Sequence, residues 1–225
     1  MKRFNGAMLA VFLGLLGIAG AKTAHHGGRA AADFDYYVLA LSWSPAFCTG
    51  AAGQQAGKAE QCHKTLGFVV HGLWPQFNNG KWPHDCKLKG RKEVPAELAA
   101  LVLNTELPMP PGDPALLSHE WTKHGTCSGL DQQAYFSTIR AAAAQVKIPP
   151  ELQQPDLPVT MDFSAIVDSF AAVNPGLAAE MLDAHADAKG NVTEIYICFS
   201  KALSFQTCVG STNQDSGGQF LPVSQ

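Results

Sequence analysis

Runs of hydrophobic residues predict three strand-forming regions. The stretch Tyr36–Trp43, YYVLALSW, is almost entirely hydrophobic, and so is Leu66–Val70, which ends at His71. Short continuous runs of this kind are typical of strands buried on both faces. Residues 191–208, NVTEIYICFSKALSFQTC, alternate hydrophobic and polar positions and predict a hairpin.

Four segments between these strands have the periodicity of helices: residues 94–107, 114–124, 131–146 and 162–173. For the second of them, Asp113-Pro114 suits the start of a helix and Gly125 suits the position just past its end. Strands early and late in the chain with helices between them predict an α+β fold, in which helices pack beside an antiparallel sheet.

Residues 1–21 have the three parts of a secretory signal peptide. They are the charged start MKR, the hydrophobic core Ala7–Ala19, which is short for a bilayer span, and small residues before a predicted cut after Ala21. We expect a flexible leader over residues 22–33 and a single domain over residues 34–225. A cleaved signal peptide predicts a secreted or periplasmic protein without stable membrane association.

The net charge argues against a protein that binds nucleic-acid phosphates electrostatically over a broad surface. The whole chain has a formal net charge of −3, and removal of Lys2 and Arg3 leaves 14 basic against 19 acidic residues. Surfaces that bind nucleic acid electrostatically are usually basic, and here the one basic run is KLKGRK, residues 87–92. A nucleic-acid substrate would therefore be held locally, in a pocket.

Six cysteines predict three disulfides. An even number behind a signal peptide favours disulfides, and no CxxC pair suggests a zinc site. The sequence alone leaves fifteen pairings open among Cys48, Cys62, Cys86, Cys127, Cys198 and Cys208.

The predicted helix 114–124 carries a dense group of titratable side chains. Residues four apart share a face of a helix, so Glu120 lies beside His124 and His119 lies beside Lys123. The zinc-protease pattern His-Glu-x-x-His requires a histidine where this chain has Lys123, which argues against a metal site.

Two purely structural interpretations compete with a catalytic one. The helix could be a solvated, charge-rich helix whose buried stripe is Leu117 and Trp121, although this leaves its two histidines unexplained. His71 alone could be a hydrogen-bonded core histidine. Together, histidines on separate elements could flank a phosphate as acid and base, because imidazole titrates near neutral pH.

Four segments resemble the ribonuclease T2 family. HGLWPQ (71–76) and HEWTKHGTC (119–127) are similar to the two active-site segments of the family, and YVLALSWSPAFC (37–48) and EIYICF (194–199) extend the resemblance over most of the chain. The resemblance implies the same α+β fold and an endoribonuclease that needs no metal or other cofactor.

The resemblance also implies a role for each residue. His124 would take the proton of the ribose 2′-OH, His71 would protonate the leaving 5′-oxygen, His119 would hold the phosphate, and Glu120 and Lys123 would stabilise the transition state. The products would be a 2′,3′-cyclic phosphate and then a 3′-phosphate. DNA lacks the 2′-OH and could not be cut. Spacing alone does not say which histidine is the base, and it equally allows Glu120 to orient His124.

A base-binding site is expected just after His71. In the family, the positions of Trp74, Gln76 and Trp82 line the site for the base before the cut, and stacking on aromatic rings predicts low base specificity. Trp74 could instead be a core residue that anchors the turn. An aromatic residue often precedes the second segment in the family, whereas this chain has Leu116 and Leu117 there.

The remaining expectations concern covalent links and rival functions. The resemblance implies Cys86–Cys127, and short loops favour Cys48–Cys62 and Cys198–Cys208. We expect a monomer that acts on single-stranded RNA. The main alternative is a catalytically silent, extracellular binding protein on the same fold, which would have no chemical reason to keep every catalytic residue.

Overall fold

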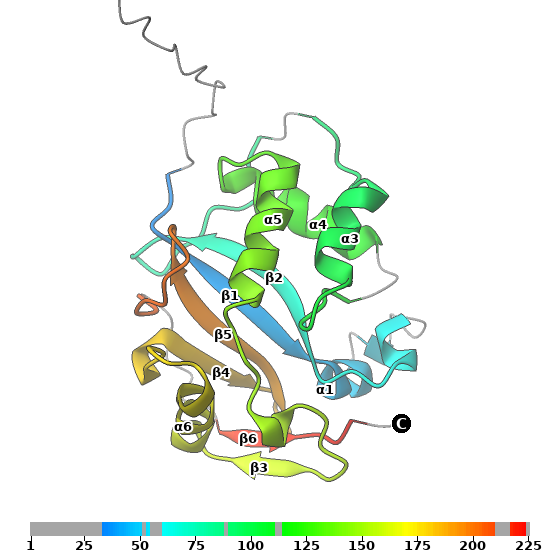
Figure 1. The fold of residues 1–225 in the computed structure, drawn as a ribbon, viewed down its shortest axis with the longest axis vertical. Helices are drawn as coiled ribbons and strands as arrows, with labels where there is room; N and C mark the ends of the chain where they lie inside the picture. The colour runs from blue at the N-terminus through cyan, green and yellow to red at the C-terminus, as the bar shows by residue number, and fades with distance from the viewer. Residues whose placement is uncertain are drawn as a thin grey trace, which may run out of the picture.

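A four-stranded antiparallel sheet organises the chain. The structure is a computed structural model that describes residues 33–50, 53–54, 60–87, 90–110, 114–209 and 217–223. The strand order is β2-β1-β5-β4, and a small second sheet pairs β3 with β6 (Figure 1). The strands are β1 (Tyr36–Trp43), β2 (Phe68–Gln76), β3 (Val159–Met161), β4 (Leu182–Ala186), β5 (Val192–Ser200) and β6 (Gly218–Phe220).

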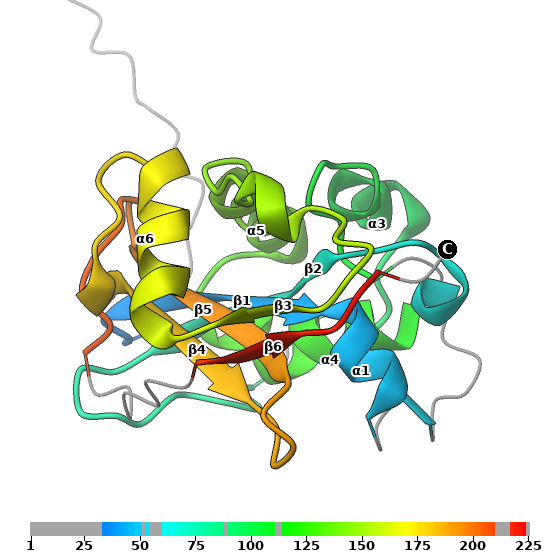
Figure 2. The same cartoon turned by 90° about the horizontal axis from the view of Figure 1, so that it is seen from below.

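Helices cover the two faces of the sheet unequally. Figure 2 shows α3, α5 and α6 on one face and α4 on the other. The helices are α1 (Ser44–Thr49), α3 (Ala96–Leu103), α4 (Pro114–Lys123), α5 (Gln132–Ala143) and α6 (Phe163–Val173), with short 3₁₀ turns at Glu60–His63, Gly125–Cys127, Pro150–Leu152 and Ala179–Met181.

Capping residues fix where two of these helices begin. The side chains of Asp131 and Asp162 each accept a hydrogen bond, at 2.8 Å, from the backbone N–H three residues further on. This satisfies one of the N–H groups that a helix start leaves without a partner. The predicted cap of α4, Asp113, lies outside the described residues.

Alternation along the central strands separates the core from a polar face. Leu39 and Leu41 of β1 and Ile195 and Ile197 of β5 are fully buried in the main core beneath α5 and α6. Successive side chains of a strand point to opposite faces, so the intervening residues, among them Ser42, Glu194 and Tyr196, face the side of α4. This second face therefore carries polar side chains.

The predicted antiparallel α+β fold is confirmed, with corrections to individual elements. The strand expected to end at His71 continues to Gln76, because its second half pairs with β1. Strand β4, LDAHA, was not predicted because it has no β-branched residue, and it forms by pairing with β5. Helix α1 was also missed, since six residues are too few to show a helical period.

The predicted terminal hairpin is only partly present. Strand β5 pairs with β1 and β4 inside the sheet, and the chain that follows it returns to it through one bridge, Phe199–Phe205. Two backbone hydrogen bonds, from Ser200 N–H to Ser204 and from Gln206 N–H to Cys198, and the Cys198–Cys208 disulfide hold the return. Residues 94–107 were expected to be helical throughout, but α3 covers only Ala96–Leu103.

All three predicted disulfides are confirmed. Cys48–Cys62 ties α1 to the following 3₁₀ turn, and Cys198–Cys208 closes a short loop after β5. Cys86–Cys127 spans 41 residues and joins the loop after β2 to the turn that follows α4. It therefore links the two segments that carry the predicted catalytic histidines.

The predicted signal peptide and leader, residues 1–33, lie almost wholly outside the described residues. Within the part of the chain that is described, no helix is long and apolar enough to cross a membrane.

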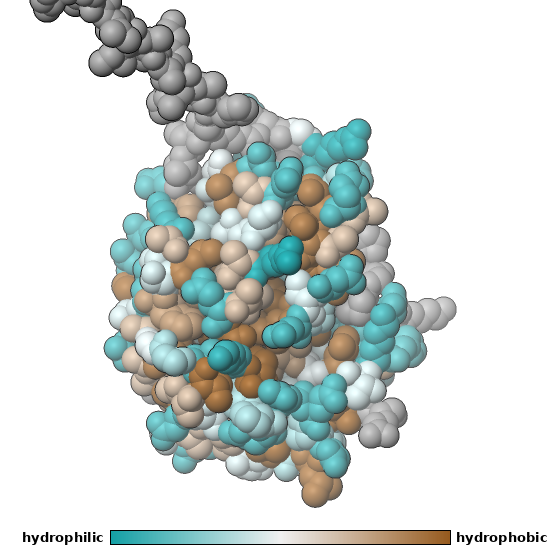
Figure 3. All heavy atoms as spheres, viewed as in Figure 1, coloured by the Kyte–Doolittle hydropathy of each residue, from teal (hydrophilic) through white to brown (hydrophobic). Residues whose placement is uncertain are grey.

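The face over α5 and α6 mixes hydrophilic and hydrophobic residues (Figure 3).

The Cys86–Cys127 disulfide should contribute most to stability. We expect Cys86→Ala/Cys127→Ala to lower the free energy of unfolding by about 4 kcal/mol and Cys198→Ala/Cys208→Ala by about 3 kcal/mol, because the longer loop restricts the unfolded chain more. Denaturant unfolding with the other disulfides intact measures both. An equal or smaller loss in the first variant would contradict the expectation.

Candidate active site

One pocket collects every predicted catalytic and base-binding residue. It has a volume of about 480 Å³ and lies between β2, α4 and the polar face of β5 and β4. It is lined by Tyr36, Val38, His71, Trp74, Gln76, Gly80, Trp82, His119, Glu120, Lys123, His124, Asp183, His185 and Tyr196. A larger hollow of about 1250 Å³ beside α5 contains none of these residues.

A β-bulge places His71 in this pocket. Ala40 of β1 pairs with Gly72 and Leu41 pairs with Val70, so His71 is the extra residue of β2. Bulges re-aim side chains and are common next to active sites. Sequence reasoning expected His71 at the end of a strand; the structure places it inside a strand, where the bulge rather than the strand end turns it to the pocket.

Gly72 allows α4 to approach β2 closely. A Cβ atom built on Gly72 would overlap the Glu120 carboxylate and the Trp74 indole nitrogen. Only glycine leaves room for both groups, so the residue after His71 is fixed by the packing of the helix against the strand.

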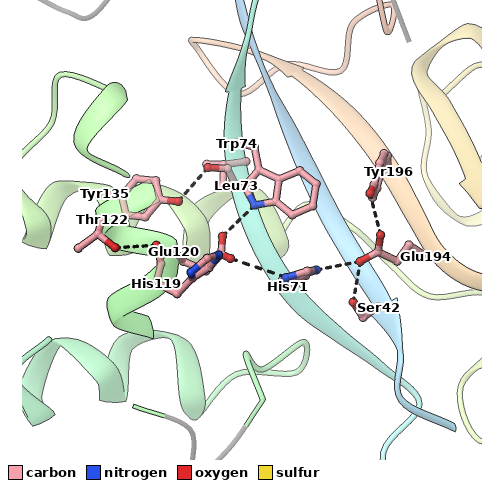
Figure 4. Close-up of polar contacts among 10 residues, drawn as sticks. All are labelled: Ser42, His71, Leu73, Trp74, His119, Glu120, Thr122, Tyr135, Glu194 and Tyr196. Atoms are coloured by element: carbon pink, nitrogen blue, oxygen red, sulfur yellow. Dashed lines mark hydrogen bonds and ion pairs between the residues drawn. The ribbon is translucent and has the colours of Figure 1, made fainter. Parts of the chain in front are cut away.

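Glu120 is a fully buried carboxylate that joins the two elements. Its Oε2 accepts a hydrogen bond from Trp74 Nε1–H at 2.8 Å, and its Oε1 lies 3.7 Å from His71 Nε2 (Figure 4). Burial raises the pKa of Glu120 to about 7, although the neighbouring His71 and the Trp74 hydrogen bond lower it. The carboxylate thus faces His71 and Trp74, and not His124, which was the alternative partner.

His124 lies just past α4 and is buried against Trp74. The two rings stack with their centroids 5.1 Å apart, and His124 is 6% exposed. Burial, together with the charges of Lys123, His119 and His71, lowers its pKa to about 3. His124 is therefore a neutral imidazole near neutral pH, able to accept a proton.

His119 and Lys123 lie on the outer face of α4, one turn apart. His119 is exposed, and desolvation together with the charges of Lys123 and His71 lowers its pKa. The opposite face of the helix buries Leu117 and Trp121, each 2% exposed, which is the apolar stripe that the spacing predicted.

Sequence reasoning missed Glu194, which contacts His71 directly, as well as Tyr36, Asp183, His185 and Tyr196 of the pocket lining. The Oε1 atom of Glu194 lies 2.8 Å from His71 Nδ1, and the Glu194 carboxylate also accepts hydrogen bonds from Ser42 and Tyr196 (Figure 4). Burial lowers the pKa of His71, but the Glu194 hydrogen bond and the charges of Glu120 and Glu194 outweigh it, so the pKa is raised. A glutamate in the buried strand EIYICF was the available signal.

The residues expected to bind a base take different positions. Trp74 belongs to β2, with one edge against His71 and one face on His124, so it supports the histidines as well as lining the pocket. Gln76 ends the same strand. Trp82, in the following loop, is 53% exposed although it lines the pocket, which leaves its ring free to stack on a ligand.

The site defines a class of protein. Two imidazoles share one pocket, and their environments move the pKa of His71 up and that of His124 down. Such divergence is the pattern of a general acid and a general base. A cation and a third histidine beside them suit an anionic substrate group. The pocket therefore has the groups that general acid–base chemistry requires, on a fold held by three disulfides.

Comparisons with known proteins agree with this class. A model of the Ribonuclease T2 family matches residues 34–208. The chain is 29% identical over 192 residues to "Intracellular ribonuclease LX" of Solanum lycopersicum, covering 78% of each chain. It is 29% identical over 181 residues to "Ribonuclease I" of Escherichia coli (strain K12), covering 65% of this chain and 67% of the relative.

Solved structures share the fold. The crystal structure of RNase NT in complex with 5′-AMP aligns with a TM-score of 0.61 and 22% identity, covering 84% of this chain and 99% of that one. The RNase-related protein from Calystegia sepium aligns with a TM-score of 0.63 and 23% identity, covering 85% and 98%. The chain belongs to the ribonuclease T2 family, and the named ribonucleases among its relatives support an RNA endonuclease.

The low pKa of His124 gives a direct prediction. His124 should stay neutral well below 6.5, the ordinary value for histidine, in an NMR titration of its ring. Lys123→Met removes a neighbouring cation and should raise the pKa of His124, because the imidazolium is then less repelled. Lys189→Met, at an exposed turn, is the control and should leave it unchanged. An unaltered titration in Lys123→Met would contradict this account.

Proposed function

We propose that this chain is an endoribonuclease that cleaves single-stranded RNA with low base specificity and without a metal ion. The observation that carries the proposal is geometric: His71 and His124 line one pocket on either side of Trp74, and the Glu194 carboxylate lies 2.8 Å from His71 Nδ1. Their surroundings move the pKa of His71 up and that of His124 down. An acid and a base prepared in advance suit a reaction in which one oxygen loses a proton while another gains one.

In the first step the ribose 2′-oxygen attacks the adjacent phosphorus. His124 takes the 2′-hydroxyl proton as the P–O2′ bond forms, and His71 gives a proton to the 5′-oxygen as the P–O5′ bond breaks. The products are a 2′,3′-cyclic phosphate and a free 5′-hydroxyl. His119 and Lys123, on the outer face of α4, hold the phosphate oxygens, whose negative charge increases in the transition state.

In the second step water opens the cyclic phosphate with the roles reversed. His71, now neutral, takes a proton from water, and His124, now protonated, returns its proton to the 2′-oxygen. A 3′-phosphate results and both histidines regain their starting states. In its ionised form Glu120 places negative charge 3.7 Å from His71 Nε2 and stabilises the imidazolium during the cycle.

The proposal restricts the substrate to RNA, because the attacking group is the 2′-hydroxyl that DNA lacks. It places the base before the cut between Trp74, Gln76 and Trp82. An aromatic face accepts any base, and an amide can donate to or accept from a base edge, so discrimination should be weak.

We also propose export to an oxidising compartment, either the periplasm or the medium. Three disulfides support this, because such bonds persist chiefly outside the reducing cytosol. The relatives include a protein named "Extracellular ribonuclease LE", from Solanum lycopersicum, at 27% identity.

A catalytically silent binding protein on the same fold is the rival. The paired histidines, their divergent pKa values and the buried Glu120 give no advantage to a protein that only binds, so the geometry favours catalysis. The two possibilities differ in one measurement, turnover of RNA by the purified protein.

Removal of either reacting histidine should nearly abolish activity. We expect cleavage of RNA in excess EDTA, with cyclic-phosphate intermediates and 3′-phosphate ends, and losses of about 10²–10⁴-fold in His71→Ala and in His124→Ala. Lys123→Ala and Glu120→Gln should lose less. The exposed His63 provides the control, since His63→Ala should be unaffected. Full activity in either histidine variant, or abolition by EDTA, would refute the mechanism.

The base site can be tested separately from the chemistry. Trp82→Ala should raise KM for dinucleotides by about fivefold or more with the fold intact, because a lost stacking contact costs about 1–3 kcal/mol. Gln76→Asp should change the ranking of bases. Leu157→Ala, which removes a 76% exposed apolar side chain, is the matched control. An unchanged KM together with an unchanged ranking would place the base elsewhere.

A further inference from the structure

Three hydrogen bonds converge on the Glu194 carboxylate. His71 Nδ1 lies 2.8 Å from Oε1, Ser42 Oγ–H donates to the same oxygen at 3.0 Å, and Tyr196 O–H donates to Oε2 at 2.7 Å. An ionised carboxylate is purely an acceptor, so three donors favour the ionised form. Burial raises the pKa of Glu194, but the His71 hydrogen bond and charge, with the Tyr196 and Ser42 hydrogen bonds, outweigh it and lower the pKa.

The network is built on paired strands. Ser42 of β1 is directly opposite Glu194 of β5, and His185 of β4 is opposite Glu194 on its other side. Tyr196 is two residues further along β5, so it shares the same face. The His185 ring packs on Tyr196 with centroids 4.2 Å apart, which bounds the network on the β4 side.

This placement decides which nitrogen of His71 carries the proton in the neutral ring. Because Glu194 is an acceptor, Nδ1 must be the donor, and Nε2 is then the nitrogen left for chemistry. Nε2 points away from Glu194 toward α4, where Glu120 lies at 3.7 Å.

The two carboxylates beside His71 are not equivalent. Glu120 is fully buried, accepts one hydrogen bond from Trp74, and burial raises its pKa to about 7. Glu194 accepts three hydrogen bonds and is held in the ionised form. Lys123, on the α4 side, opposes a positive charge on His71. Glu194 is therefore the group on the strand side that pairs with the imidazolium.

We propose that Glu194 is a positioning residue for His71. Ser42 and Tyr196 hold the Glu194 carboxylate, which accepts the Nδ1–H of the imidazole and so directs Nε2 to the substrate. The same carboxylate is the counter-charge of the ring when it is protonated. The catalytic consequence rests on the proposed function, whereas the state of the ring does not. Sequence spacing gives no hint of this pair, because 123 residues separate its members.

Two substitutions separate charge from shape. Glu194→Gln keeps the size and one acceptor oxygen but removes the charge, and Glu194→Asp keeps the charge on a shorter side chain. We expect His71 to titrate at lower pH in Glu194→Gln and closer to wild type in Glu194→Asp, as followed by NMR of the ring. Glu97→Gln, exposed on α3 on the far side of the sheet, makes the same change of charge and should have no effect.

The two reaction steps provide a signature that mere structural damage cannot imitate. In transphosphorylation His71 must be protonated, so activity falls as pH rises through its pKa. In hydrolysis of the cyclic phosphate His71 must be neutral, so activity rises through the same pKa. In Glu194→Gln the fall of the first activity and the rise of the second should both move to lower pH. We also expect kcat to fall about 10–100-fold, which is the loss found when a residue that orients a metal-bound histidine is removed.

The outcomes are distinguishable. If His71 titrates alike in wild type and Glu194→Gln, or equally shifted in the Asp and Gln variants, the proposed role of Glu194 is overturned. The wild-type protein gives an independent check, since the ¹⁵N shifts of neutral His71 must show the proton on Nδ1, and a proton on Nε2 would refute the proposal even if a variant failed to fold. Absence of ribonuclease activity in wild type would overturn the proposed function alone.

Discussion

The contact between α4 and the bulged part of β2 is the constraint on which the site depends. Gly72 removes the side chain that would keep the helix away, and the buried Glu120 carboxylate then reaches the indole N–H of Trp74. This one hydrogen bond joins the element that carries His71 to the element that carries His119 and Lys123. A buried carboxylate without such a partner would cost several kcal/mol, so the pair is well specified.

Trp74 extends the same contact to the second buried histidine of the pocket, His124. Its ring stacks on His124 and meets His71 edge-on, so both imidazoles are positioned by one aromatic side chain between them. The Cys86–Cys127 disulfide closes the arrangement from the other side, and the backbone N–H of Asp85 donates to the carbonyl of Lys123 beside it. Packing, a polar contact and a covalent link thus hold the same two segments together.

Electrostatics then makes two chemically identical side chains different. His124 is desolvated beside cationic neighbours and has no carboxylate partner among the described residues, so its neutral form is favoured. His71 is also desolvated, but Glu194 accepts its Nδ1–H, so its charged form is favoured. The charge of Lys123 lowers the pKa of both rings, so the difference arises from the carboxylates of Glu194 and Glu120 beside His71.

Much of the fold and most of the site could be predicted from the sequence, because the relevant signals are local. The hydrophobic run of β1, the capping aspartates of α5 and α6, and the Leu117–Trp121 stripe of α4 each act within a few residues. Strand β4 and helix α1 were missed for the same reason, since a weakly hydrophobic strand is stabilised by its partner and a six-residue helix shows no period. The bulge at His71 depends on pairing with β1, which no local pattern records.

The sequence by itself determined which chemical groups this protein has and which short segments carry them: the histidines, Glu120, Lys123, the tryptophans of the pocket and the cysteines. Only the tertiary structure decided how those groups ionise and which way they point. Desolvation and neighbouring charge set a pKa, and both come from residues brought together by the sheet. Glu194 shows this most clearly, because it reaches His71 only after β1, placed between β2 and β5, has paired with both strands.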